Sequence, residues 1–553
     1  MIGVISKKNE IGVVEEFFQL FKTPWEFYKD DKDYDVVIIS RNEVNDEINS
    51  KLLLIFGSEP TQFDNNNGFI LYKNYNINTL DFGEITLPIY TQISTFKNIS
   101  YGDAIFKVNS EVIGLEIKRY NQIVLRIGYN LFDEVSYLIT MGQPIKKANI
   151  PTLENHIALL RKWIIKAGVP LIEFPPIPWD YNFITCLTHD VDFVRIRNHI
   201  FDYSIWGFIY RGLFGSLKKL LNGKVSFSCL LQNWKAVLTL PFVYLGLADD
   251  CWFQFNNYLK IEKDLKSTYF FIPFKNRTGD KVSSPNASLR AAKYDINNLK
   301  ELLSNLVSKN VEIGIHGIDA WHDVESGIQE KEKIAEIIGG ANLGIRMHWL
   351  LHDKQTFHTL EKAGYIWDSS FGYNETIGYR GGTTQVFKPI GARNLLELPM
   401  HIQDSALFFP HRMGLSKKQA FRLCKNLINN SSIYGGVLTL NWHQRSLGPE
   451  RLWGDFYLRL LKELQVRNAW FASANQAVEW FRKRRAVLFE EVRFSGNKLR
   501  LSLRSDEVDI QPPLTIRIYR PLYKKLEKND FSFRMRNYFD MPWDGKREIE
   551  ISI

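Results

Sequence analysis

Between residues 183 and 445, short apolar runs repeatedly end in side chains that can do chemistry. The run "FITCLTHDVD" ends in Asp190 and Asp192, "VEIGIHG" ends at His316, and "GGVLTLNWH" ends in His443. Segments with helical spacing, such as "NNLKELLSNLVSK" and "KQTFHTLEKAG", lie between several of these runs. A strand, a polar tip and a helix, repeated in this order, predict an α/β fold of the (β/α) barrel type. The active site of such a fold lies at the C-terminal ends of the strands.

Asp190 and Asp192 stand two residues apart at the end of the first apolar run. Side chains with this spacing face the same way on a strand. Two carboxylates side by side next to a core repel each other and lose hydration. A bound metal ion would compensate for both effects, so we expect a metal site here.

The rest of the chain divides into three parts. Residues 1–170 begin with "IGVIS", a helix-like "VVEEFFQLF" and "YDVVIIS", which predict a non-catalytic α/β domain. The segment 170–182 has four prolines, which indicates an irregular boundary. We expect the barrel over 171–480. After it, "VLFEEVRFSG-NKLRLSLRS" and later apolar runs predict a small β-sandwich over 481–553.

An aromatic and basic insertion interrupts the barrel pattern at about 195–250. Its sequence "YSIWGFIYRGLFGSLKKLLNGK" fits two interpretations: a helical hairpin packed on the barrel, or a peripheral membrane contact through 203–224. No run of ~18 apolar residues occurs, so we expect no transmembrane segment. The N-terminal "MIGVISKKNEIG" lacks the apolar core of a signal peptide, so we expect a cytoplasmic protein. If residues 203–224 contact a membrane, we expect the protein to be peripheral to that membrane.

Charge and composition narrow the range of partners. The net charge of +9 is modest for 553 residues and no nucleic-acid-binding motif occurs, so we expect no nucleic-acid partner. Aromatic residues make up 14% of the chain, which suits stacking on sugar rings but is equally consistent with an aromatic core.

Five motifs in order, "THDVD", "EIGIHGIDAW", "GIRMHW", "YIWDSS" and "LNWH", resemble the NodB-homology polysaccharide deacetylases, carbohydrate esterase family four. The resemblance covers about 183–445. It implies an N-acetylated glycan as the substrate and a divalent metal, usually zinc, held by one Asp and two His. In this family the metal acidifies a water molecule and polarises an acetamide carbonyl.

The resemblance also assigns roles to residues of this chain. Asp190 matches the general base, and Asp192 matches the metal-bound carboxylate. His316 matches the first metal-binding histidine, and His443 matches the general acid.

Two further positions match residues that orient the catalytic groups. Arg346 matches an arginine that would hold Asp190 ionised by charge-assisted hydrogen bonds. Asp368 stands where the family has a carboxylate that orients the catalytic histidine.

The second motif departs from the family pattern. The position of the usual second metal-binding histidine is Ala320. Two replacements are available: His322, from a loop, and His348, at the tip of the next predicted strand. We favour His348 slightly, because neighbouring strand tips converge.

Three side chains are candidates for binding the substrate. Arg380, in "GYNETIGYRGGT", would hold an anionic or hydroxyl-rich group. Trp349 and Trp442 flank strand tips and would stack on sugar rings, or else belong to the core.

Three functions are therefore open. The first is a metal-dependent hydrolase that removes N-acetyl groups from an amino sugar in a polysaccharide, an oligosaccharide or a lipid-linked precursor. The second, motivated by Ala320, is a carbohydrate-binding protein that has lost the chemistry. The third is a hydrolase of a non-sugar amide.

Overall fold

We describe the protein from a computed structural model. The structure describes all residues except 43–47, 75–77, 84, 98, 100, 224, 282–286, 341, 496–497, 507–508, 521–537 and 553. The chain forms two compact units, each built from separate segments. The first unit comprises Met1–Asp180, Tyr379–Gly391 and Glu479–Ile553, and the second comprises Tyr181–Gly378 and Ala392–Val478.

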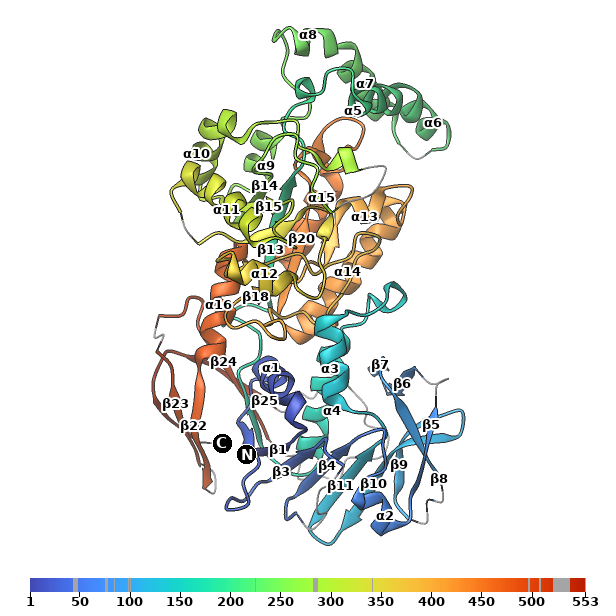
Figure 1. The fold of residues 1–553 in the computed structure, drawn as a ribbon, viewed down its shortest axis with the longest axis vertical. Helices are drawn as coiled ribbons and strands as arrows, with labels where there is room; N and C mark the ends of the chain where they lie inside the picture. Colours follow the sequence, from blue (N-terminus) through green and yellow to red (C-terminus); the bar gives the residue numbers. More distant parts are fainter. Residues whose placement is uncertain are drawn as a thin grey trace. The chain divides into compact units, whose positions relative to one another are not determined.

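A parallel sheet forms the centre of the second unit (Figure 1). Its strands are β13 (Phe183–Val191), β14 (Ser267–Phe271), β15 (Glu312–Gly317), β16 (Ile345–Met347), β17 (Trp367–Asp368), β18 (Leu396–Glu397), β19 (Ile402–Gln403), β20 (Val437–Asn441) and β21 (Ala469–Phe471). The strand order is β18-β17-β16-β15-β14-β13-β20-β19, and β21 pairs with the beginning of β13. Every neighbouring pair is parallel.

Helices connect most of these strands. They are α9 (Phe255–Ile261), α10 (Lys300–Ser308), α11 (Val324–Ile338), α12 (Thr356–Lys362), α13 (Asp404–Phe408), α14 (Lys417–Tyr434) and α15 (Gly454–Val466). All nine residues of β13 are buried, as expected for a parallel strand covered on both faces. The structure thus confirms an α/β fold. The pairing places β18 and β19 at the two edges of the sheet, and a closed barrel stays a prediction.

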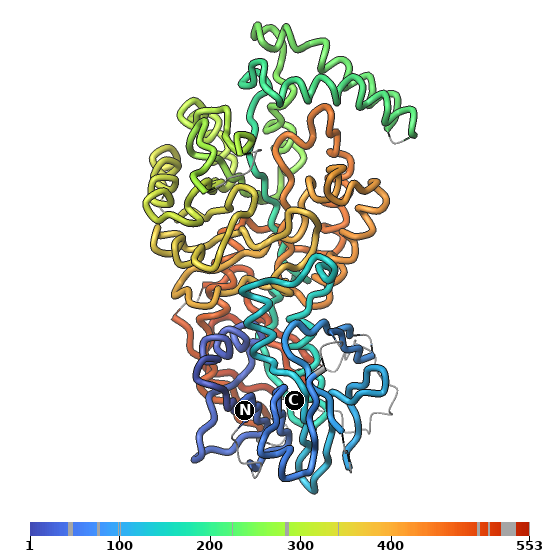
Figure 2. Tube along the Cα trace, turned by 45° about the vertical axis from the view of Figure 1, so that its right-hand side comes forward, coloured from blue at the N-terminus to red at the C-terminus, as the bar shows by residue number. Residues whose placement is uncertain are grey.

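The expected insertion folds as a group of helices within the second unit. They are α5 (Tyr203–Tyr210), a π-helical turn η4 (Arg211–Gly215), α6 (Ser216–Leu221), α7 (Phe227–Leu238) and α8 (Leu240–Tyr244). In Figures 1 and 2 they lie together in green at one end of this unit.

The first unit contains a mixed sheet in the order β2-β1-β3-β4-β11-β10-β8-β5, with β9 paired to β10. The strands are β1 (Ile2–Ile5), β2 (Trp25–Phe27), β3 (Val36–Ile39), β4 (Leu52–Phe56), β5 (Ile70–Asn74), β8 (Ile93–Lys97), β9 (Asp103–Val108), β10 (Glu111–Arg119) and β11 (Gln122–Ile127). A two-stranded sheet, β6 (Thr79–Phe82) and β7 (Ile85–Pro88), accompanies it. The helices are α1 (Ile11–Phe21), α2 (Gln62–Asn67), α3 (Leu131–Thr140) and α4 (Thr152–Lys166).

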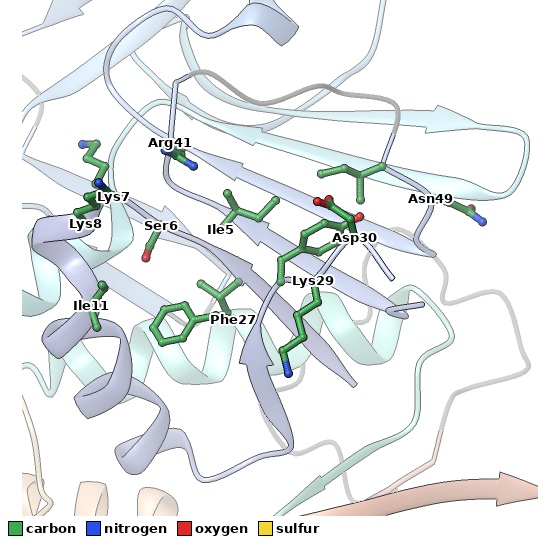
Figure 3. Close-up of a pocket in the computed structure, with 13 residues that line it drawn as sticks. Ile5, Ser6, Lys7, Lys8, Ile11, Phe27, Lys29, Asp30, Arg41 and Asn49 are labelled. Carbon is green, nitrogen blue, oxygen red and sulfur yellow. The ribbon is translucent and has the colours of Figure 1, made fainter. Parts of the chain in front are cut away.

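A cavity of about 750 Å³ opens at the carboxyl ends of β1, β2 and β3 in the first unit. Ile5 and Phe27 line it together with Lys7, Lys29 and Arg41 (Figure 3). It lies where a ligand site of an open α/β sheet is expected, although the motifs assigned no function to this domain.

The C-terminal strands form two antiparallel three-stranded sheets in the first unit. One contains β22 (Leu488–Ser495), β23 (Lys498–Arg504) and β26 (Glu548–Ser552); the other contains β12 (Leu171–Glu173), β24 (Leu514–Tyr519) and β25 (Tyr538–Trp543). The helix α16 (Ala474–Ala486) precedes β22. A β-sandwich stays a prediction. The expected boundary at 171 needs revision, because β12 pairs with β24 rather than opening the parallel sheet.

No helix in the described ranges is long and apolar enough to cross a membrane.

Candidate metal centre

In the second unit, the predicted site residues lie together at the carboxyl ends of the parallel strands. Asp190 lies near the end of β13, Asp192 directly follows that strand, and His316 lies in β15. His348 directly follows β16, and His443 comes two residues after β20. Parallel strands have their carboxyl ends on the same side of the sheet, so side chains that are far apart in sequence meet there.

Three of these side chains form a group that could hold a metal ion. One ligand atom each from Asp192, His316 and His348 lies within 4.8 Å of the other two. The Oδ1 atom of Asp192 is 3.3 Å from Nε2 of His316 and 3.5 Å from Nε2 of His348. The two imidazoles are buried, whereas the Asp192 side chain is 19% exposed, so this group is reached from the Asp192 side.

Hydrogen bonding indicates that these atoms are arranged for a cation. Nδ1 of His316 lies 2.9 Å from the carbonyl oxygen of Arg346, which only accepts, so Nδ1 carries the proton. In the neutral ring, Nε2 of His316 then presents a lone pair toward the carboxylate. Oδ1 of Asp192 is buried and has no hydrogen-bond partner among the described residues. Acceptors that face one another across a few ångströms fit a divalent metal.

Electrostatics agree with an ionised Asp192 beside neutral imidazole ligands. Burial alone would raise the pKa of Asp192, but positive charge at His348, His316 and His443 would hold it far below its ordinary value, and a bound cation at the same place would act in the same direction. Burial lowers the pKa of His348 to about 3, so its ring is neutral near pH 7. A carboxylate and neutral imidazoles are the forms that bind zinc.

Asp190 lies beside this group and is held by a buried arginine. Nη1 of Arg346 donates to Oδ1 of Asp190 at 2.9 Å, and the amide of Asn441 donates to Oδ2 at 2.7 Å. Burial would raise the pKa of Asp190, yet the charge of the Arg346 guanidinium holds it below the ordinary value. Asp190 is therefore an ionised proton acceptor 3.8 Å from Nε2 of His316.

His443 lies on the other side of Asp192, with its Nε2 atom 3.7 Å from Oδ2 of that carboxylate. Its Nδ1 atom is 2.6 Å from Oδ1 of the buried Asp404, whose Oδ2 accepts the backbone N–H of His443. Burial would lower the pKa of His443, but the Asp404 carboxylate raises it above the ordinary value. The imidazole is thus oriented with Nε2 toward the metal group.

The structure corrects the role that we expected for Asp368, which was to orient His443. Oδ1 of Asp368 accepts a hydrogen bond from Ser370, and the Ser370 hydroxyl in turn accepts the backbone N–H of Met347. His443 is oriented by Asp404 instead. The strand order explains the difference: β20 neighbours β19, which Asp404 follows, whereas β17 lies beyond β16 at the other side of the sheet.

Asp368 nonetheless belongs to a segment that positions Arg346. The side chain of Ser369 accepts from Nη2 of Arg346 at 2.9 Å, and its carbonyl accepts from Nε at 3.1 Å. Burial raises the pKa values of Asp368 and of its neighbour Glu397. The "WDSS" segment therefore fixes the position of Arg346, and Arg346 in turn fixes the position of Asp190.

The structure separates the two candidates for the third ligand. His348 joins Asp192 and His316, because β16 pairs with β15. Nε2 of His322 instead lies 3.3 Å from Oδ1 of Asp319. Ala320, at the position of the usual histidine, is fully buried.

The predicted substrate-binding residues have different surroundings. The Trp442 side chain is fully buried and stacks on Phe456 and Tyr457, so it is a core residue and not a platform for a sugar. Trp349 is only partly buried and has a left-handed backbone (φ 67°) directly after His348. Arg380 lies in the segment Tyr379–Gly391, which belongs to the first unit, and its role stays a prediction.

Two functional residues were missed in the sequence. Asp404 ends the run "LLELPMHIQD", a pattern like the others, but nothing in the sequence shows that its strand pairs with β20. Asn441 sits in "TLNWH" two residues before His443, on the buried last position of β20.

No protein-family model matches the chain, and no curated protein matches it. Among solved structures, similar ones include a proposed polysaccharide deacetylase from Mycobacterium smegmatis, with 17% identity and a TM-score of 0.34 over 56% of this chain and 94% of that one. A probable polysaccharide deacetylase from Pseudomonas aeruginosa PAO1 has 14% identity and a TM-score of 0.34, over 56% of this chain and 94% of that one. Puue allantoinase also has 14% identity and a TM-score of 0.34, over 55% of this chain and 92% of that one. The chemistry is inferred from the side chains described above and not from these likenesses.

Proposed function

We propose that this protein is a metal-dependent hydrolase that removes N-acetyl groups from an amino sugar in a polysaccharide, an oligosaccharide or a lipid-linked glycan precursor. One observation carries the proposal. A group of one carboxylate and two imidazoles lies between an ionised carboxylate, Asp190, and a histidine oriented by a buried carboxylate, His443.

The metal ligands in this proposal are Asp192, His316 and His348, and the proposed ion is Zn²⁺. When bound, the ion would acidify a water molecule and polarise the acetamide carbonyl. Each imidazole offers Nε2 to the same point, and the Arg346 carbonyl fixes the His316 ring for this role.

Asp190 is the proposed general base. Its carboxylate accepts the proton of the attacking water, because Arg346 and Asn441 keep it ionised and fix its direction. His443 is the proposed general acid and donates from Nε2 to the departing amine nitrogen. Asp404 stabilises the protonated imidazole during this transfer.

The geometry favours a hydrolase over a protein that only binds carbohydrate. The absence of a histidine at position 320 motivated the binding-only alternative. His348 now supplies a second imidazole nitrogen within reach of Asp192. With both a proton acceptor and a proton donor beside this group, the arrangement contains the parts that hydrolysis needs.

Release of acetate from chitin oligosaccharides, peptidoglycan fragments and lipid-linked N-acetylated sugars tests the proposal, with non-sugar acetamides in the same panel. The zinc-loaded chain should release acetate and produce a free amine on at least one sugar. Asp190→Asn should lower kcat by about 10²–10⁴-fold, whereas His322→Ala should retain activity. Turnover of non-sugar amides alone, or of no compound at all, would contradict the proposal.

A further inference from the structure

The helices inserted after β13 expose many large apolar side chains. Monomeric proteins rarely expose contiguous apolar patches larger than a few hundred Å². Here the exposed large apolar side chains of residues 200–247 include two tryptophans and four phenylalanines. In Figures 1 and 2 these helices extend from one end of the second unit.

The first helical stretch, α5–η4–α6, has an exposed stripe along its length. The stripe follows spacings of three and four residues, as the side chains on one side of a helix do. Its members are Tyr203 (73% exposed), Trp206 (57%), Tyr210 (64%), Phe214 (64%), Leu217 (38%) and Leu221 (79%). The opposite side carries Ile205 and Phe208, which are buried. Among the described residues, the side of this stretch that carries Ile205 and Phe208 is packed in a core cluster, and the side that carries the stripe is exposed.

The second stretch, α7–α8, repeats the pattern. Its exposed members are Phe227 (62%), Leu231 (49%), Trp234 (36%), Leu238 (71%) and Phe242 (53%). Its buried residues, including Ala236, Leu240 and Val243, pack in one core cluster with Ile205, Phe208 and Trp252. Each stretch thus packs one side against the other stretch and leaves its opposite side exposed. We call the two exposed stripes together the apolar face.

Exposed lysines lie beside the apolar face, whereas Arg211 on η4 is paired with Glu450 and an exposed Asp249 follows α8. Lys218, Lys219 and Lys235 are exposed on the same helices. Asp202 is the only acidic residue between 200 and 248, and its carboxylate pairs with His199 and caps α5. Tryptophan and tyrosine next to lysine are the composition of helices that lie in a membrane interface.

We propose that the apolar face docks the second unit on the surface of a lipid bilayer with anionic headgroups. The aromatic and aliphatic side chains enter the boundary between headgroups and acyl chains, and the lysines contact the lipid phosphates. The proposed contact is with the bilayer surface; no described helix is long and apolar enough to span the bilayer. A dimer of two copies through this face would bring its lysines together, which disfavours that occupant.

Flotation of the full-length chain with vesicles tests this proposal. The chain should float with vesicles of phosphatidylcholine and phosphatidylglycerol, and at least tenfold less with phosphatidylcholine alone. Trp206→Ser with Phe214→Ser, and separately Lys218→Gln with Lys219→Gln, should each reduce the bound fraction about tenfold. Leu458→Ser with Val466→Ser is the matched control, because both side chains are exposed on α15 (41% and 81%), and it should float as the wild type does.

Three results would overturn the proposal: no flotation of the wild type, equal flotation of the double variant Trp206→Ser/Phe214→Ser, or equal loss in the α15 control. Light scattering without vesicles adds a fourth. If the wild type is a dimer that the double variant converts to a monomer, the apolar face is an interface between copies. Because this experiment measures lipid binding, it tests the membrane proposal independently of deacetylase activity.

Discussion

At the scale of single residues, two carboxylates that stand two positions apart have different partners, and we propose different roles for them. Asp192 faces imidazole nitrogens and has an unpartnered buried oxygen, which suits a metal ligand. Asp190 accepts from a guanidinium and an amide, which suits a proton acceptor. The i, i+2 spacing predicted a metal site at this pair, and the contacts support the separate roles that we propose for the two carboxylates.

Replacing Asp404 tests the orientation of His443. Asp404→Asn removes the charge that stabilises a protonated imidazole, so kcat should fall by about 10²–10⁴-fold with little change in KM. Activity and metal content should be measured together, because the bound metal should stay at the wild-type level. Wild-type kcat in this variant would show that Asp404 does not position His443.

Part of the site could be predicted from residues alone. The polar strand tips indicated Asp190, Asp192, His316 and His443, since a parallel sheet gathers such tips at one edge. The role of Asp404 could not, because it depends on β19 pairing with β20 rather than on any local pattern. Trp442 was ambiguous in sequence, and its stacking on Phe456 and Tyr457 identifies it as core.

At the scale of elements, periodicity predicted the strands and helices of the second unit well but not the pairing of short segments. β12 has only three residues in a proline-rich stretch, and its partner β24 lies more than 300 residues later. The segment Tyr379–Gly391 similarly leaves the second unit and contacts α4 of the first. Such long-range contacts leave no repeating pattern in the sequence.

The contact of α4 with this segment predicts a pH-dependent stability. Oε1 of the buried Glu154 accepts from Thr383 and Thr384, whereas Oε2 has no partner among the described residues. Burial raises the pKa of Glu154 to about 7, so the folded state holds a proton that the unfolded state loses near pH 4.5. The resulting stability is full below pH 4.5 and is lost as the pH rises through 7.

Glu154→Gln keeps the acceptor at Oε1 and does not titrate. Relative to the wild type, its free energy of unfolding should therefore increase from pH 5 to pH 8, by about 3 kcal/mol at most. Urea denaturation at both pH values measures this difference, and Glu325→Gln on the exposed side of α11 is the control. A constant difference between wild type and Glu154→Gln would exclude this protonation.

At the scale of the whole molecule, the proposed metal centre and the apolar face belong to the same compact unit. Asp190 lies near the end of β13 and Asp192 directly follows it, and the inserted helices come next in the chain, beginning with α5 at Tyr203. A lipid-linked glycan would bring substrate and bilayer to this one unit. The first unit has a basic cavity of its own at the ends of β1, β2 and β3, which the proposed hydrolysis does not use.

The most direct test of the central claim is the amount of metal per chain in the purified protein, measured by elemental analysis after zinc is supplied. We expect close to one zinc per wild-type chain, and loss of that zinc in Asp192→Ala, His316→Ala and His348→Ala. His322→Ala, whose side chain pairs with Asp319, should keep it. A wild-type chain that binds neither zinc, cobalt nor nickel, or a His348→Ala variant with full occupancy, would contradict the metal centre described here.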